Sequence, residues 1–240
     1  MDAGADVAVF DSRPAHEYFR MNIPGARNCP GADLVYRLPA AVPSRDTLVV
    51  VNCAGRTRSI IGTQSLINAG FPNRVEALRN GTMGWHLAGF SLQSGHVDPV
   101  QTPDAAGRAA AHRMAEGVRE RFRIRVLDAA ALGVLFAEAA SAPLYVLDVR
   151  SPEEYAAGHM PGMLHAPGGQ LVQATDLFLG IREARVVLVD DDGVRATMTA
   201  SWLLQLGWPE VSVFRMPEPG GAGWLVARDS VPALPQHRHT

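Results

Sequence analysis

The residues with the clearest chemical potential lie in a short segment that begins at Cys53. Four apolar residues, Leu48 to Val51, lead into Asn52-Cys53-Ala54-Gly55-Arg56-Thr57-Arg58-Ser59, and a helix-like pattern follows. This order predicts a thiol in a turn between a strand and a helix. Backbone N–H groups at a helix start and the guanidiniums of Arg56 and Arg58 favour the thiolate, which is the nucleophilic form. The segment predicts an activated cysteine that handles a small anion; the alternative is a buried, inert cysteine at a strand end.

The chain carries its pattern of special residues twice. A gap-free offset of 137 positions places Asp11 on Asp148 and Arg13 on Arg150. The same offset pairs Glu17 with Glu154, Tyr18 with Tyr155, Pro24 with Pro161, Gly25 with Gly162, Pro30 with Pro167, Gly31 with Gly168, Arg58 with Arg195, Leu66 with Leu203, Gly70 with Gly207 and Pro72 with Pro209. We therefore expect two copies of one domain. Cys53 falls on Asp190, so the second copy lacks the nucleophile.

The composition is that of a globular chain with two ordinary cores. The 240 residues are 47% hydrophobic and 19% charged, which suits two domains. The net charge of -2, without a block of like charge, argues against nucleic acid as a partner. No apolar run approaches the roughly 18 residues of a membrane span, and the N-terminus does not resemble a signal peptide.

Cysteine and histidine usage gives a second set of expectations. Cys29 and Cys53 are the two cysteines, which does not indicate a disulfide framework. A working thiolate suits a reducing compartment, so we expect a cytoplasmic protein. The eight histidines show no metal-ligand spacing, and no metal site is expected.

Strand-like and helix-like segments alternate, which predicts parallel sheets in α/β domains. In the first copy, strands are expected at 7–10, 27–29, 47–51 and 75–78, and helices at 14–21, from 32, and at 57–69. Gly81, Gly84 and Trp85 predict a turn, which Gly220, Gly221, Gly223 and Trp224 mirror in the second copy. Expected boundaries are 1–95 for the cysteine domain, 96–125 for a linker and connecting helix, and 126–232 for the second domain. Within the connection, 93–107 is expected as linker and 108–125 as helix.

The two copies differ at their start. The first strand begins within six residues of Met1, whereas a helix-like stretch at 128–140 precedes the second copy's first strand at 144–147. Two interpretations remain open here, a chain cut from something longer and a domain with a short start.

The residues of both copies resemble the rhodanese family. The first copy shows Asp11-Ser12-Arg13, Glu17-Tyr18, Ile23-Pro24-Gly25-Ala26 and, above all, the loop CAGRTRS that begins at Cys53. The second shows Asp148-Val149-Arg150, Glu154-Tyr155 and Gly158-His159-Met160-Pro161-Gly162. The resemblance covers about 7–90 and 144–226. It implies two tandem rhodanese-like domains, each a central parallel sheet flanked by helices.

The length of the cysteine loop distinguishes this chain from phosphatases with related chemistry. Cys53 and Arg58 form a C-x4-R pattern, whereas those phosphatases use C-x5-R, which would need arginine at Ser59. The shorter ring indicates a pocket sized for sulfur rather than phosphorus. Many family loops carry glycine where this chain has Arg56, so the extra cation should make the pocket more anion-seeking; Gly193 holds that place in the second copy.

The resemblance implies sulfur transfer. The Cys53 thiolate would attack the outer sulfur of thiosulfate or a similar donor, and a thiol or cyanide would take the sulfur from the resulting persulfide. Arg56 and Arg58 would bind the sulfonate oxygens of the donor. No metal or organic cofactor is implied. The N–H groups that would cradle the thiolate and the persulfide belong to Ala54, Gly55, Arg56, Thr57, Arg58 and Ser59.

Several residues near the loop are expected to support it rather than react. Asp11 and Arg13 should form a buried pair beneath the loop, and Glu17 and Tyr18 should belong to the same scaffold. Trp85 is expected either in the core or in the wall of the pocket. Arg79 or Asn80 is expected at the border of the site. Cys29 is expected to be a small buried residue or, alternatively, a resolving thiol.

The second copy is expected to be inactive, because a carboxylate cannot form a persulfide. Asp190 would instead occupy the anion site of its own loop, with Arg195 opposite. Better-known two-domain rhodaneses place the inactive copy first. The reverse order here resembles an active–inactive pair from a longer bacterial protein with several rhodanese domains.

Two other function classes stay open beside a thiosulfate-type sulfurtransferase. A phosphatase or arsenate reductase would use the same kind of loop, although the loop length argues against it. A persulfide carrier or redox-sensing module would load sulfur without rapid turnover.

Overall fold

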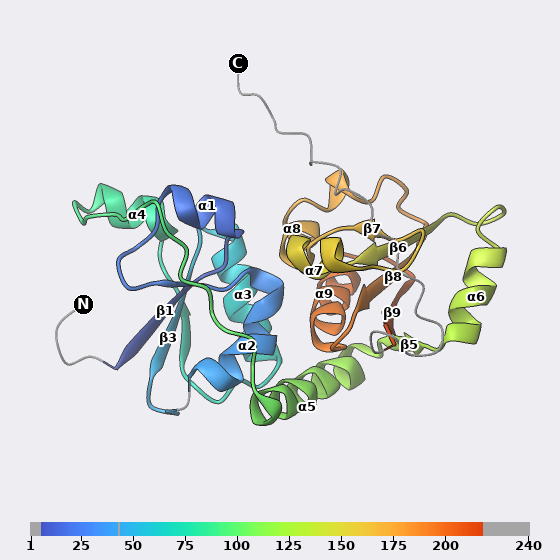
Figure 1. Cartoon of the computed structure of the whole chain (residues 1–240), viewed down its shortest axis with the longest axis horizontal. Helices are drawn as coiled ribbons and strands as arrows, with labels where there is room; N and C mark the ends of the chain where they lie inside the picture. Colours follow the sequence, from blue (N-terminus) through green and yellow to red (C-terminus); the bar gives the residue numbers. More distant parts are fainter. Residues whose placement is uncertain (1–5, 43, 218–240) are drawn as a thin grey trace, which may run out of the picture.

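The computed structural model describes residues 6–42 and 44–217. Two α/β units lie side by side and are joined along one edge by a long helix, α5 (Ala105–Phe122) (Figure 1). We call the unit before this helix the first domain and the unit after it the second domain. Two copies of one α/β fold are thus confirmed, as the internal offset predicts.

The first domain is built on a four-stranded parallel sheet. Its strands lie in the order β2-β1-β3-β4, and they are β1 (Val7–Asp11), β2 (Arg27–Asn28), β3 (Leu48–Asn52) and β4 (Val75–Ala77). The central strands are rich in valine because helices cover both faces of such a sheet. β1 pairs with β3 from Val7 with Leu48 to Asp11 with Asn52, so Asp11 and Asn52 end adjacent strands at the same edge.

The second domain repeats this sheet and extends it by one strand. Its order is β5-β9-β8-β6-β7, from β5 (Arg125–Leu127), β6 (Leu144–Asp148), β7 (Leu164–His165), β8 (Arg185–Asp190) and β9 (Val211–Arg215). The sequence prediction of a helix up to residue 125 was wrong at its end. Arg123 adopts a left-handed conformation (φ 52°) that stops α5, and the chain then pairs with β9.

Helices flank both sheets. In the first domain they are α1 (Ala15–Arg20), the 3-10 turn η1 (Gly31–Asp33), α2 (Leu34–Ala41), α3 (Thr57–Asn68) and α4 (Gly81–Leu87). In the second they are α6 (Ala129–Ala137), α7 (Pro152–Ala157), α8 (Gly168–Gln173), the 3-10 turn η2 (Thr175–Leu177) and α9 (Val194–Gln205). The segment predicted as a turn at Gly81 to Trp85 is the helix α4. Its counterpart at Gly220 to Trp224 lies outside the described residues.

The segment predicted as a linker is fastened to the first domain. Asn22 and Gln93 exchange backbone hydrogen bonds, and Asn28 bonds in the same way to Asp98 and Val100. The side chain of Asp104 then caps α5 by accepting from the Gly107 N–H. The connection therefore runs along a domain surface before the helix starts.

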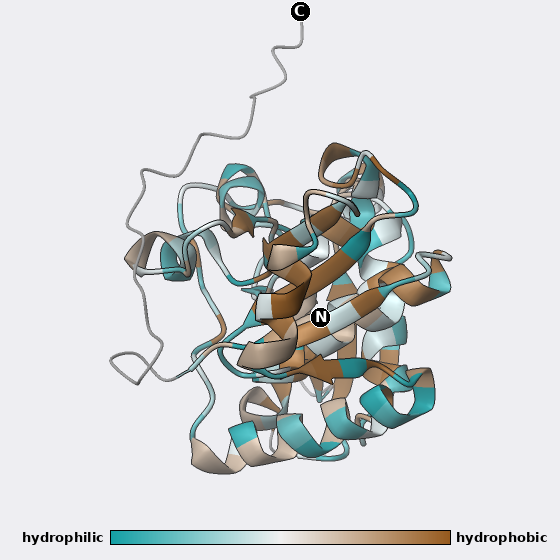
Figure 2. Cartoon of the chain, turned by 90° about the vertical axis from the view of Figure 1, so that its right-hand side faces the viewer, coloured by the Kyte–Doolittle hydropathy of each residue, from teal (hydrophilic) through white to brown (hydrophobic). Residues whose placement is uncertain are grey.

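Buried apolar side chains fill both domains. Figure 2 shows hydrophobic strands in the middle of the molecule and the largely hydrophilic helix α5 below them. One buried cluster joins first-domain residues such as Leu34 and Val51 to Val194 and Met198 of α9, so the domains share part of a core. Among the described residues, no helix combines the length and apolarity needed to cross a bilayer.

Candidate active site

Cys53 lies at the carboxyl end of β3, where ligands usually bind in parallel sheets. The residue is only 2% exposed. Its Sγ lies 3.5 Å from Oγ of Ser59, to which the thiol donates. Ser59 Oγ in turn donates to the carbonyl of Arg56 at 3.0 Å. The Cys53 thiol therefore sits inside its own loop, and a hydroxyl lies within reach of the sulfur.

The backbone of this loop offers a set of open N–H groups. Within the described chain, no protein acceptor binds the N–H groups of residues 54 to 59. The first residue after Cys53 whose N–H donates to the backbone is Ile60, which donates to the Arg56 carbonyl. Successive free N–H groups at a strand–helix turn form a concave anion site. The loop can therefore hold the negative charge of a thiolate, a persulfide or a donor anion.

The two arginines of the loop have different surroundings. Arg58 donates to both carboxylate oxygens of Glu17, at 2.5 and 2.7 Å. Burial opposes ionisation of Glu17, but the hydrogen bonds and charge of Arg58 outweigh it and leave the pKa of Glu17 below its ordinary value. Arg56 is exposed and makes no side-chain hydrogen bond or ion pair with the described residues. The structure thus occupies the Arg58 guanidinium with Glu17 and leaves that of Arg56 available.

A buried polar group supports the loop from below. Arg13 donates through Nε and Nη2 to the carboxylate of Asp11, and the shortest bond is 2.6 Å. Asn52 donates to Asp11 Oδ2 at 3.1 Å and to Thr82 Oγ1 at 3.0 Å. Tyr18, also buried, donates to the carbonyl of Ala26. These contacts hold residues at the base of the loop, and none of them reaches the sulfur.

The start of α4 fixes the carbonyl side of the loop, a role that sequence reasoning missed. The N–H and the Oγ1 of Thr82 both donate to the Cys53 carbonyl, at 2.8 and 3.1 Å, and the Met83 N–H donates to the Ala54 carbonyl. Gly81 makes this approach possible, because a Cβ there would lie 2.2 Å from the Cys53 carbonyl oxygen. The paired glycines at 81 and 84 were the available signal, but alone they read as a turn.

Among the described residues, the other candidates make no hydrogen bond to the sulfur. Trp85 donates from Nε1 to the Ser91 carbonyl, its ring is tilted by 36° against that of Phe90, and it packs against a small apolar cluster. Arg79 and Asn80 are exposed just before α4. Cys29 is fully buried, and burial raises the pKa of its thiol well above the ordinary value. Cys29 is thus a core residue and is unsuited to act as a resolving thiol.

The second domain fills the equivalent loop with its own carboxylates. Asp190 accepts from the N–H groups of Gly193 and Ala196 at 2.7 and 2.8 Å. Asp192 accepts from those of Val194 and Arg195 at 2.6 and 3.1 Å. Burial, and then the neighbouring charge of Asp192, raise the pKa of Asp190 well above its ordinary value. The anion site of this loop is therefore occupied from within.

The sequence predicts Arg195 opposite Asp190, and in the described structure the two side chains form no ion pair. Its guanidinium instead contacts four other carboxylates, those of Asp33, Glu154, Asp191 and Asp192. The bond to Glu154 Oε2, at 2.6 Å, repeats the Arg58–Glu17 pair of the first domain. Burial lowers the pKa of Arg195, but the charges of Asp192, Asp33 and Glu154 raise it more. The pKa therefore lies well above its ordinary value. Arg195 is therefore a structural cation.

The Arg195–Glu154 pair predicts a pH-dependent difference in stability. Burial opposes ionisation of Glu154, but Arg195 and Ser151 outweigh it and lower the pKa from 4.5 to about 2. A lowered carboxyl pKa stabilises the fold above the ordinary value and loses that effect as the pH falls towards the folded value. Glu154→Gln should cost about 2 kcal/mol in free energy of unfolding at about pH 6, with the cost shrinking towards zero near pH 2.

Urea unfolding of both proteins across this pH range measures the effect. The exposed neighbour Glu153 provides a matched control, because Glu153→Gln makes the same chemical change outside the pair. A cost for Glu154→Gln that stayed constant down to about pH 2 would contradict the assignment.

Comparisons with known proteins agree with this geometry. A family model described as Rhodanese-like domain matches residues 1–88 and 134–216. The structure of a thiosulfate sulfurtransferase from Pseudomonas aeruginosa is similar at 51% identity and a TM-score of 0.86, over 90% of this chain and 41% of that one. The HTH-type transcriptional regulator Rv0324 of Mycobacterium tuberculosis is 33% identical over 90 residues, which are 38% of this chain and 39% of that protein.

This chain spans about two fifths of the length of each of these two relatives. The two matched segments together cover more than half of the chain; the first contains the whole four-stranded sheet, and the second contains all strands of the other sheet except β5. The chain therefore belongs to the rhodanese family, with one rhodanese-like domain that carries Cys53 and a second that carries Asp190 in its place.

Proposed function

We propose that the first domain transfers sulfane sulfur from thiosulfate or a similar anionic donor to a thiol or cyanide, through a persulfide on Cys53. The observation that carries the proposal is the pairing of a cysteine with six open N–H groups in a loop beside an unpaired Arg56. The similarity to the Pseudomonas aeruginosa thiosulfate sulfurtransferase supports the donor class.

The reaction consists of two displacements at sulfur. The Cys53 thiolate attacks the outer sulfur of thiosulfate, the S–S bond of the donor breaks, and sulfite leaves with the electron pair. An acceptor thiolate or cyanide then attacks the outer sulfur of the persulfide. The Cys53–sulfur bond breaks, and the electron pair returns to Cys53. Both steps balance without an external oxidant or reductant.

The loop stabilises the charges that these steps create. The open N–H groups, which bind no acceptor among the described residues, hold negative charge on the terminal sulfur. Ser59 can turn its hydroxyl from the Arg56 carbonyl towards the sulfur, which lies 3.5 Å away. Arg56 binds the sulfonate oxygens of the donor, while Arg58 remains paired with Glu17 and keeps the loop in shape.

Intact-mass measurement after incubation with thiosulfate tests the proposal. One added sulfur atom should appear, and peptide mapping should locate it at Cys53. Addition of cyanide should remove it with formation of thiocyanate. Loading that is never released at a useful rate would favour a persulfide carrier, and turnover of an aryl phosphate without sulfur loading would favour a phosphatase.

Arg56→Ala should weaken donor binding rather than the sulfur chemistry. A charged hydrogen bond to an anion contributes about 1.5 to 3 kcal/mol, so KM for thiosulfate should rise tenfold or more at nearly constant kcat. The exposed Arg45 precedes the start of β3, whereas the loop follows its end, so Arg45→Ala provides the matched control. Equal KM values for thiosulfate in the two variants would show that Arg56 does not bind the donor.

A further inference from the structure

The loop at 190–196 of the second domain, which aligns with the Cys53 loop, differs from that loop in how deeply its residues are buried. Thr57 is exposed, whereas its counterpart Val194 is fully buried. Val194 belongs to the apolar cluster that includes Leu34 and Val51 of the first domain. Apolar side chains that leave water in this way stabilise the contact that buries them. The loop that would meet a substrate in one domain thus meets a protein surface in the other.

The arginine of this loop reaches across the same boundary. Arg195 Nη1 lies 3.5 Å from Oδ1 of Asp33, and its guanidinium lies 5.1 Å from the ring centre of Tyr36. Asp33 and Tyr36 belong to the first domain. Arg195 is 1% exposed and Asp33 is 6% exposed. A buried guanidinium needs several polar partners to offset its lost hydration, and one of them here comes from the neighbouring domain.

Hydrogen bonds within the second domain hold the loop in shape. Asp190 and Asp192 together accept from all four N–H groups of residues 193 to 196. Asp192 also accepts from Arg195 Nε at 2.6 Å, which fixes the direction of the guanidinium. Ordering entropy is thereby lost within the second domain rather than when the domains meet.

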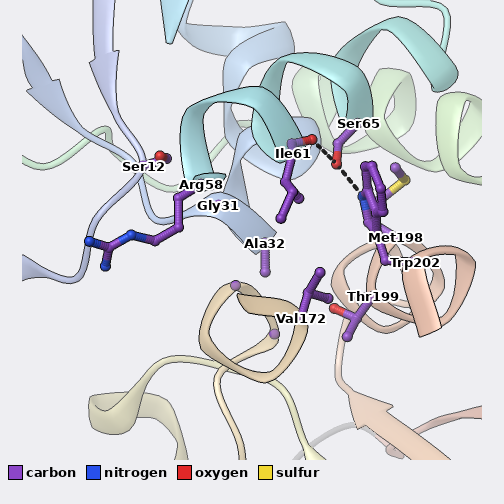
Figure 3. A pocket seen from close by; sticks show the side chains of 12 residues that line it. Ser12, Gly31, Ala32, Arg58, Ile61, Ser65, Val172, Met198, Thr199 and Trp202 are labelled. Carbon is purple, nitrogen blue, oxygen red and sulfur yellow. Dashed lines mark hydrogen bonds between the residues drawn. The ribbon is translucent and has the colours of Figure 1, made fainter. Parts of the chain in front are cut away.

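Other contacts continue the boundary beyond the loop. Figure 3 shows Trp202 of α9 donating to Ser65 of α3, at 2.7 Å, beside a small cavity that both domains line. The backbones of η1 and α8 also approach closely, because a Cβ on Gly169 would lie 3.3 Å from the Gly31 nitrogen. The boundary between the domains therefore extends beyond the loop to η1, α3, α8 and α9.

We infer that the second domain has exchanged its anion site for a docking site, and that the segment 190–196 clamps this domain onto α2 and η1 of the first domain. Its ligand is a protein surface with a buried carboxylate, Asp33, and an aromatic face, Tyr36. This role does not depend on the sulfur-transfer proposal, since it concerns only how the two domains hold each other.

Hydrogen exchange followed by mass spectrometry of the full chain tests the clamp. Asp33→Asn removes the carboxylate charge that Arg195 meets across the boundary, together with the ion pair of Asp33 with Arg37 in the first domain, and leaves the residues of the second domain's loop unchanged, so exchange in 194–205 is the decisive reading. Exchange should become about tenfold faster in both 31–41 and 194–205, which corresponds to about 1.4 kcal/mol of lost interface stability. Arg195→Met should accelerate the same two segments from the opposite side of the interface.

A matched control removes an ion pair that stays within the second domain. Arg185 binds Glu138 at 2.7 Å, and both residues belong to that domain. Arg185→Met should leave exchange in 31–41 unchanged. The clamp is refuted if Asp33→Asn leaves 194–205 at its original rate. Because Asp33 lies in the first domain, Asp33→Asn tests the clamp even if Arg195→Met unfolds the second domain.

Discussion

Replacement of Cys53 by serine should abolish sulfur loading and thiocyanate formation, with a loss of about a thousandfold or more in kcat. The serine hydroxyl occupies nearly the same space in a site that is 2% exposed, so the fold should persist. It cannot form a persulfide, because the reaction needs a sulfur nucleophile. Thiocyanate release from thiosulfate and cyanide measures turnover, and intact mass measures loading.

The other cysteine provides the control for this experiment. Cys29→Ala removes the remaining thiol from a fully buried position and should leave both loading and turnover in place. Asp190→Ala, in the second domain, should also leave turnover intact, since that loop holds no nucleophile. Residual turnover in Cys53→Ser that disappears in a variant lacking Cys29 as well would transfer the catalytic role to Cys29.

Gly81→Ala should be the most damaging change outside the loop. Its added Cβ would lie 2.2 Å from the Cys53 carbonyl oxygen and 2.8 Å from that of Gly55. Gly81 also has a φ of 55°, which costs alanine about 1 kcal/mol. Either the loop or the start of α4 must move, and a displacement of about 1 Å at a reacting group lowers kcat about a hundredfold.

Gly70 separates the two effects of that substitution. It has a φ of 70°, so Gly70→Ala carries a comparable backbone penalty, but no atom lies within 4 Å of its added Cβ. Gly70→Ala should lower the free energy of unfolding by about 1 kcal/mol and leave the rate of sulfur loading unchanged. Matching losses of loading in both variants would show that backbone strain, rather than contact with the loop, is responsible.

The fold was largely predictable because the sequence repeats its own signals. Valine-rich strands followed by helices predicted both sheets, and the 137-residue offset predicted that the domains share one plan. Even the hydrogen bonds repeat, since Arg13 with Asp11 and Arg150 with Asp148 make the same contacts. The edge strand β5 was missed, because three residues after a long helix carry too little pattern and its pairing partner lies far along the chain.

The site was predictable in its residue types but less so in its partners. Cys53 and its loop follow from local sequence, because a strand, a turn and a helix start are local features. That Glu17 pairs with Arg58 depends on contact across 41 residues, which no local pattern encodes. Two further contacts were missed for the same physical reason, the hydrogen bonds from Thr82 to the Cys53 carbonyl and the ion pair of Arg195 with Asp33 of the first domain.

The contact between Ser65 and Trp202 shows how the two domains are related in space, because these positions differ by the same offset of 137. Gly31 and Ala32 face Gly168 and Gly169, which are also counterparts. Surfaces that meet their own equivalents are the mark of an isologous homodimer. The two domains therefore meet about a pseudo-two-fold axis, as the subunits of such a dimer would. Because both halves belong to one chain, their sequences can differ, and Asp190 stands in one half where Cys53 stands in the other.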